Sequence, residues 1–327
     1  MNTQLKVLVT GANGLLGTNT IIELLKQGYQ VIGLVRNSDN YIGEYHKNLT
    51  LEEGDILDLH SLEKALMGCT YVIHTASISS PKISKYKTFE EINVHGTKNL
   101  IDAALKQKVK KVIYIGTANI FGFGTLENLG HEHNPIKSPF TKSFYSQSKL
   151  KAQELALSKS SAMEVVSINP AFMIGGYDSK PSSGVIVLRG LNKRIIFYPP
   201  GGKSFVCVTD VVQAIINSFD LGQSGEAYIV TNENLTFKAF YQMLNRKQKR
   251  KATLIKIPKY ILLLAGLFGD GLNRMGLVTS FTSNNLRLLC INSYYSNEKT
   301  KLHLRVNFTP LEEGLEDAIS WFESQQS

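Results

Sequence analysis

The stretch Thr10-Gly11-Ala12-Asn13-Gly14-Leu15-Leu16-Gly17 constrains the fold more than any other part of the 327-residue chain. It follows an apolar run at residues 5–10 that predicts a buried strand, and it leads into a predicted helix at residues 19–27. Its glycines permit a tight turn, and the first turn of a helix offers free N–H groups and a positive dipole end to an anion. The spacing is Gly-x-x-Gly-x-x-Gly rather than the commoner Gly-x-Gly-x-x-Gly, but the strand–turn–helix context still predicts a dinucleotide site. We therefore expect Gly11, Asn13, Gly14, Leu15 and Gly17 to bind a dinucleotide cofactor.

Short apolar runs alternate with amphipathic stretches through the first half of the chain. Strands are predicted at residues 5–10, 30–35, 71–75, 111–116 and 165–169, and helices at residues 19–27, 61–67, 90–106 and 145–158. Continuous β-branched runs alternating with helices are typical of a parallel sheet that is covered on both faces. The pattern therefore predicts an α/β fold with a Rossmann-type doubly wound parallel sheet.

The alternation stops after Asn169, where glycine and proline cluster in predicted loops. A strand is predicted again at residues 205–208, followed by a helix that Thr209-Asp210 would cap and by a strand at residues 227–230. We expect residues 1–170 to form an NAD(P)-binding Rossmann domain with returns near 205–230. Residues 171–204 and 231–327 would mainly form a smaller, interleaved C-terminal part that binds the substrate.

The end of the second predicted strand bears on cofactor choice. NAD enzymes place an acidic residue there, about 20 residues beyond the glycine loop, to bind the ribose 2′-hydroxyl. Here Val35 is followed by Arg36, Asn37 and Ser38. An arginine pairs with a 2′-phosphate, which a carboxylate would repel. The sequence therefore favours NADP, with NAD as the alternative because Asp39 is close by.

Tyr145 and Lys149 lie four residues apart in a predicted helix, so both side chains can face one cleft. A free tyrosine has a pKa of about 10, and a nearby ammonium lowers it by favouring the phenolate. The phenol can then act as the general acid or base beside a carbonyl oxygen. Lys149 would also bind the nicotinamide ribose. Thr117, which follows the predicted strand at residues 111–116, would supply a third hydroxyl to the substrate oxygen.

These motifs together resemble the extended short-chain dehydrogenase/reductase family. The resemblance covers almost the whole chain and includes the glycine loop, Gly54-Asp55-Ile56, His74-Thr75-Ala76, Asn93-Val94-x-Gly96-Thr97, Tyr145-x-x-x-Lys149, Asn169-Pro170 and Val208-x-Asp210-Val211. It implies that Asp55 and Ile56 contact the adenine, that Thr75 and Ala76 line the cleft near the ribose, and that Pro170 and Phe172 flank the nicotinamide. It also implies a homodimer formed through the helices at residues 90–106 and 145–158. One departure is Gly116-Thr117, where the family more often has serine.

Three functions are compatible with this resemblance. The apolar stretch Pro170-Ala171-Phe172-Met173-Ile174 and the Ile257-Pro258 segment are similar to the dihydroflavonol-4-reductase branch, which reduces apolar carbonyl compounds. This similarity favours a carbonyl reductase or alcohol dehydrogenase acting on a small, apolar molecule. A sugar-nucleotide epimerase or dehydratase is the second candidate, since Lys203 lies where such enzymes grip a diphosphate with arginine. A non-catalytic dinucleotide sensor is the third.

The remaining features predict no further site. The formal net charge of +9 comes without a nucleic-acid-binding motif, and three sparse cysteines predict a cytoplasmic protein with reduced thiols. The longest apolar run, residues 260–268, is too short to span a bilayer and predicts a packed helix, with a membrane-surface role as the alternative. His131 and His133 predict a solvated loop rather than a metal site, and His74 a hydrogen-bonded core histidine.

Overall fold

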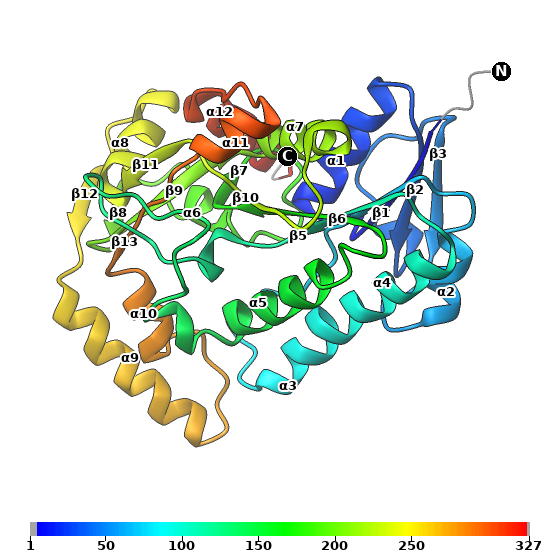
Figure 1. The fold of residues 1–327 in the computed structure, drawn as a ribbon. Helices are drawn as coiled ribbons and strands as arrows, with labels where there is room; N and C mark the ends of the chain where they lie inside the picture. The colour runs from blue at the N-terminus through cyan, green and yellow to red at the C-terminus, as the bar shows by residue number, and fades with distance from the viewer. Residues whose placement is uncertain (1–4, 326–327) are drawn as a thin grey trace.

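The computed structural model describes residues 5–325. Its centre is a seven-stranded, wholly parallel sheet with the order β10-β6-β5-β4-β1-β2-β3 (Figure 1). The strands are β1 (Lys6–Thr10), β2 (Gln30–Val35), β3 (Leu49–Glu53), β4 (Tyr71–His74), β5 (Lys111–Ile115), β6 (Glu164–Pro170) and β10 (Ala227–Val230). The strand order reverses between β1 and β4, which is the arrangement of a Rossmann fold. The predicted fold class is confirmed.

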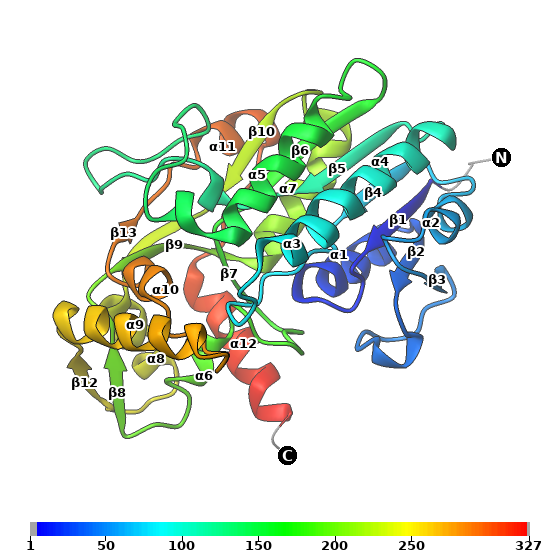
Figure 2. The same ribbon diagram turned by 90° about the horizontal axis from the view of Figure 1, so that it is seen from below.

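Helices cover both faces of this sheet (Figures 1 and 2). One layer contains α1 (Leu15–Lys26), α7 (Val208–Leu221) and α11 (Glu298–Leu304). The other contains α2 (Leu59–Ala65), α4 (Gly96–Lys106) and α5 (Phe144–Leu157), with α3 (Tyr86–Phe89) and a π-helical turn (Glu90–His95) leading into α4. An apolar cluster fills the space between the sheet and each layer, because the strands alternate their side chains between the two faces.

A smaller part lies beyond the carboxyl ends of the central strands. It contains the sheet of β7 (Phe172–Ile174), β9 (Gly202–Cys207), β11 (Glu233–Thr236) and β13 (Asn292–Ser293), and the pair β8 (Ile195–Tyr198) and β12 (Thr253–Lys256). Its helices are α6 (Val185–Leu188), α8 (Phe237–Lys247), α9 (Lys259–Arg274), α10 (Ser283–Leu288) and α12 (Leu311–Ser324). Phe322 of α12 belongs to its apolar core. Residues 208–230 cross back to the central sheet as α7 and β10, so the two parts are interleaved.

The boundaries near residue 205 differ from the sequence prediction. The strand there begins at Gly202 and joins the smaller sheet, and α7 begins at Val208 without a side-chain cap. Asp210 therefore does not cap the helix. Its carboxylate accepts hydrogen bonds from Thr309 N (3.1 Å) and Thr309 Oγ1 (2.7 Å), which tie α7 to the chain that leads into α12. A local capping pattern cannot predict that Thr309, which is distant in the sequence, hydrogen-bonds the carboxylate instead.

The helix predicted at residues 260–268 is also not packed as expected. It exists as α9, but Leu262, Gly266 and Gly269 are its buried residues, and most of its large apolar side chains are exposed. The rest of the protein covers only a narrow stripe of this apolar helix, formed by the three buried residues. Within residues 5–325, no helix has both the length and the apolar content needed to cross a bilayer.

Candidate active site

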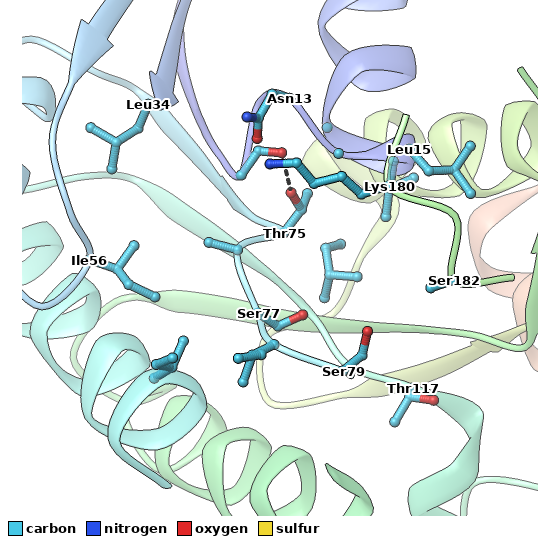
Figure 3. A pocket seen from close by; sticks show the side chains of 18 of the residues that line it. Asn13, Leu15, Leu34, Ile56, Thr75, Ser77, Ser79, Thr117, Lys180 and Ser182 are labelled. Carbon is cyan, nitrogen blue, oxygen red and sulfur yellow. Dashed lines mark hydrogen bonds between the residues drawn. The ribbon is translucent and has the colours of Figure 1, made fainter. Parts of the chain in front are cut away.

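A cavity of about 570 Å³ opens at the carboxyl ends of the central strands, at the reversal of strand order (Figure 3). Such a crevice is the usual ligand site of an open α/β sheet. Its wall brings together most of the residues that the sequence singled out: Gly11, Asn13, Gly14, Leu15, Gly17, Arg36, Asp55, Ile56, Thr75, Ala76, Thr117, Tyr145 and Pro170. Residues that are far apart in the sequence therefore share one cavity.

The glycine loop leaves room for a ligand at the start of α1. Gly11 has φ of +66°, and a Cβ there would lie 2.8 Å from Thr75 Oγ1, so only glycine suits the position. Gly14 is the N-cap of α1 and offers no side-chain cap to the first turn, which also contains no acidic residue. The nearest protein atom to a Cβ on Gly14 would be the Gly11 carbonyl oxygen at 3.4 Å. The open N–H groups of this turn therefore fit the phosphates of a dinucleotide.

Thr10 and Thr75 hold the two sides of the cavity together. Thr75 Oγ1 donates to the Thr10 carbonyl (2.6 Å) and lies 3.4 Å from the Gly11 carbonyl, an interaction drawn in Figure 3. Thr10 Oγ1 accepts from Ala76 N (3.2 Å) and contacts His74 Nδ1 (2.8 Å). His74 Nε2 contacts Thr97 Oγ1 (3.0 Å), so the buried His74 is hydrogen-bonded at both ring nitrogens, as predicted. Burial lowers the pKa of His74 to about 3, with the positive charge of Lys149 acting in the same direction.

Two cationic side chains line the end of the cavity near the glycine loop. Arg36 follows β2, and Lys180 comes from a loop of the smaller part. Figure 3 shows Lys180 extending over the cavity toward Asn13 and Thr75. The Lys180 loop contacts the glycine loop, because Ser179 Oγ donates to the Asn13 carbonyl at 3.4 Å. Sequence reasoning missed Lys180, since no local motif indicates that this loop reaches the opposite wall.

A buried polar chain positions Thr117. Thr117 N donates to Asn169 Oδ1 (3.0 Å), Asn169 Nδ2 donates to Ser167 Oγ (2.9 Å), and Ser167 Oγ donates to Gln153 Oε1 (2.6 Å). A Cβ on Gly116 would lie 1.9 Å from Asn169 Oδ1. The Asn169 amide therefore takes the space that a serine side chain at position 116 would need, which explains this departure from the family pattern.

Tyr145 and Thr117 both line the wall of the cavity. Burial raises the pKa of Tyr145 to about 12, and the nearby Thr117 hydroxyl acts in the opposite direction. The sequence predicted that Lys149 would lower the pKa of Tyr145. In this structure the pKa of Tyr145 is raised instead. Lys149 is buried and Tyr145 is partly buried, and desolvation penalises the charged form of each.

Lys149 is buried behind the wall that Tyr145 lines. Its Nζ donates to the Ile115 carbonyl and lies 4.4 Å from the centroid of the Tyr114 ring. Burial lowers the pKa of Lys149 to about 7. The ammonium therefore has a carbonyl and an aromatic face as its partners here, one turn of helix from the phenol.

Phe172 lies outside the cavity wall, in contrast to the sequence prediction. Its ring packs against Phe205 with a centroid separation of 5.5 Å, and the next residue, Met173, lines the cavity instead. Successive side chains of a strand point to opposite faces, so one residue decides which side chain enters the site. Other lining residues that sequence reasoning missed are Ser77, Ile78, Ser79, Ile92, Asp178 and Ser182.

His131 and His133 lie in the loop that precedes η4 (Phe140–Lys142), with both side chains at or near the surface. Their ring centroids are 5.8 Å apart. In the part of the chain that the structure describes, no group of three or more His, Cys, Asp or Glu side chains is placed to hold a metal ion.

Comparison with known proteins identifies the family of this chain. A model of the NAD dependent epimerase/dehydratase family matches residues 7–231. Sterol demethylase protein B of Methylococcus capsulatus is 27% identical over 321 residues, covering 96% of this chain and 97% of that protein. A putative dihydroflavonol 4-reductase of Synechocystis is 27% identical over 325 residues, covering 97% of this chain and 94% of that protein. The crystal structure of gox2253 superposes with a TM-score of 0.83 at 26% identity, covering 98% of each chain.

Proposed function

Because the chain belongs to the NAD dependent epimerase/dehydratase family, for which an NAD(P) dinucleotide is the typical cofactor, we propose that it is an NADP(H)-dependent oxidoreductase. It interconverts a carbonyl and an alcohol on a small, apolar substrate. The observation that carries the proposal is that Thr117 and Tyr145 lie together in the wall of the cavity that starts at the glycine loop.

The bound nicotinamide supplies or accepts the hydride. Tyr145 holds the proton that balances this transfer: its phenol is protonated at neutral pH and can donate to an oxygen that gains negative charge. The Thr117 hydroxyl lines the same cavity and can orient the same oxygen. Lys149, which is held by Ile115, would bind the ribose and carry a positive charge that stabilises the phenolate once the proton has left.

The cofactor preference rests on the charged side chains at the end of the cavity near the glycine loop. Arg36 lines this end, whereas Asp39 is not among the lining residues. The carboxylate of Glu53, at the end of β3, is used locally, because Glu53 Oε1 accepts from both Ser38 N and Ser38 Oγ at 2.8 Å. The acids near the second strand thus leave Arg36 free to meet a 2′-phosphate, which favours NADP.

The substrate class is inferred from the lining of the cavity that contains Tyr145. Ile78, Ile92, Ile115, Ala171 and Met173 contribute apolar surface to this cavity. Such a lining binds by hydrophobic burial and uses its polar groups for orientation. The names of the two relatives, a sterol demethylase protein and a putative dihydroflavonol reductase, point in the same direction.

A sugar-nucleotide epimerase or dehydratase is the second candidate. The observation that favours it is Lys203 in β9, a cation that lies over the Phe140 ring at 5.3 Å and whose pKa burial lowers to about 8. A substrate diphosphate could pair with it. Lys203 is not among the residues lining the cavity, which favours the reductase.

We further propose a homodimer formed through α4 and α5, and a cytoplasmic location. The first rests on the family resemblance and on the packing of α4 against α5 on one face of the sheet. The second is supported by Cys69, Cys207 and Cys290, all of which are free thiols.

Thermal-shift measurements with both cofactors and two substrate panels test the reductase. NADPH should raise the melting temperature more than NADH, and apolar ketones, but not UDP- or GDP-sugars, should raise it further. Hydride transfer from NADPH to one of these ketones, followed at 340 nm, then completes the test. Stabilisation by UDP- or GDP-sugars without any response to ketones would replace the reductase with the epimerase.

A further inference from the structure

We propose that α9 and the loop after it form a face that docks on an anionic membrane surface. Many large apolar side chains of α9 and of residues 275–281 are exposed to solvent. They are Tyr260, Ile261, Leu264, Leu267, Phe268, Met275, Leu277, Val278 and Phe281, hereafter called the α9 face. Soluble monomers rarely leave so many large apolar side chains together in water, and such patches mark interaction sites. Figure 2 shows α9 at the rim of the molecule, outside the layers that cover the central sheet.

The packing of α9 fixes this face outward. Gly266 and Gly269 are turned to the protein, where an added Cβ would lie 2.7 Å from Ser283 Cα and 1.9 Å from the Phe281 carbonyl oxygen. The backbone of α9 thus touches the segment that begins α10, and larger side chains cannot enter this contact. Leu264, Leu267 and Phe268 lie on the opposite side, spaced by three and four residues as a helical stripe requires. The apolar side chains therefore cannot be buried by rotating the helix.

The charges around the α9 face complement an anionic surface. Residues 256–287 contain four basic side chains (Lys256, Lys259, Arg274 and Arg287) and one acidic side chain, Asp270. All four basic residues are exposed, and none forms an ion pair among the described residues. Asp270 Oδ1 accepts from Ser283 N at 3.1 Å, so the one acid serves the internal packing of α9. A helix with apolar residues on one side and lysine or arginine at its margins is typical of proteins that lie in a lipid interface.

The neighbouring chain segment adds to this charge. Asn285 Nδ2 of α10 donates to the Pro81 carbonyl at 3.4 Å, which joins α10 to the segment at residues 77–87. That segment carries Lys82, Lys85 and Lys87, all exposed, while Ser77, Ile78 and Ser79 line the cavity. The helix α10, which packs against α9, thus lies beside a segment that lines the cavity. A membrane held there would bring lipid-dissolved molecules close to the cavity.

The geometry and the charge argue against other occupants. The helix has 16 residues and therefore lies on a bilayer rather than across it. A second copy of the chain would meet the α9 face through a twofold axis and bring the four basic residues toward their own equivalents. If the α9 face instead met only an acidic partner protein, the wild type would not bind anionic vesicles.

Vesicle flotation with the full-length protein tests the proposal. Vesicles of phosphatidylcholine with about 30% phosphatidylglycerol should bind the protein, and binding should weaken with salt and on pure phosphatidylcholine, because counter-charges are screened or absent. Leu264→Glu/Phe268→Glu, at positions 63% and 70% exposed, should reduce binding at least about ten-fold. Leu302→Glu, at a position 76% exposed on α11, is the matched control and should bind like the wild type.

Melting temperature and NADPH affinity show that each variant is folded, and both should stay unchanged. Binding lost in Leu264→Glu/Phe268→Glu but kept in Leu302→Glu supports the proposal. Failure of the wild type to bind anionic vesicles overturns it. A concentration-dependent dimer that the double variant dissolves, or equal vesicle binding by all three proteins, overturns it as well.

Discussion

The amide oxygen of Asn169 fills the space that a side chain on residue 116 would need, so Gly116 and Asn169 depend on each other. The same oxygen accepts a hydrogen bond from Thr117 N at 3.0 Å. The backbone of Thr117 is thus held by a side chain from the neighbouring strand β6. Gly116→Ser, which restores the residue more common in the family, should displace the amide and leave the buried N–H without its partner. An unpaired buried donor costs about 1–3 kcal/mol. We expect a loss of stability of this size and a lower kcat.

A double-mutant cycle with Asn169→Ala checks this relationship. The second substitution removes the atoms that a side chain at position 116 would meet, so the double variant should be more stable than the sum of the single effects predicts. Urea unfolding provides the free energies. Strict additivity would show that the two residues do not compete for one space.

Tyr145→Phe should reduce kcat by at least about 100-fold while NADPH binding stays within two-fold, because general acid–base catalysis of this kind contributes about 10²–10⁴. Tyr145 and the glycine loop both line the cavity, and the proposed function assigns proton transfer to the phenol and phosphate binding to the loop. Tyr86→Phe is a matched control, since Tyr86 packs against Phe144 beside the site without lining the cavity. Turnover by Tyr145→Phe at the wild-type rate would remove Tyr145 from the reaction.

Arg36→Ala should weaken NADPH binding about ten-fold and leave NADH binding unchanged, since a charge-assisted hydrogen bond is worth about 1.5–3 kcal/mol only when the 2′-phosphate is present. Lys180→Ala should instead weaken both cofactors, because Lys180 lies over the glycine loop near Asn13. Cofactor fluorescence titration measures both effects. Lys26→Ala, near the other end of α1, controls for the loss of one positive charge. Equal losses of NADPH and NADH in Arg36→Ala would contradict the assignment.

The pH dependence of stability should contain a contribution from His74. Its pKa is about 3 in the folded protein and 6.5 ordinarily, so the unfolded chain takes up a proton that the folded chain refuses between these values. Stability from this group is present above pH 6.5 and is lost as the pH falls, by about 2 kcal/mol between pH 7 and pH 5.

His74→Leu should flatten this part of the curve, although the variant is less stable at pH 7 because Thr10 and Thr97 lose their shared partner. Unfolding free energies at pH 5, 6 and 7 measure the slope. His131→Gln, in a surface loop, should keep the wild-type slope. Parallel curves for wild type and His74→Leu would disprove the role of His74.

The sequence by itself determined the central sheet and the phosphate end of the site, because both follow from local signals. A glycine trio between an apolar run and a helix has one dominant structural solution, and alternating β-branched runs and helices lead to a parallel sheet. Tyr145 and Lys149 could be paired for the same reason, since one turn of helix separates them.

Only the tertiary structure decided which distant groups meet. The lysine of a remote loop reaches the glycine loop, Met173 rather than Phe172 enters the cavity, Asn169 excludes a side chain at position 116, and the apolar side of α9 stays in solvent. Each of these outcomes depends on competition between surfaces far apart in the chain, for which local periodicity contains no information. Burial reversed the predicted shift of the Tyr145 pKa in the same way, because desolvation is a property of the assembled site.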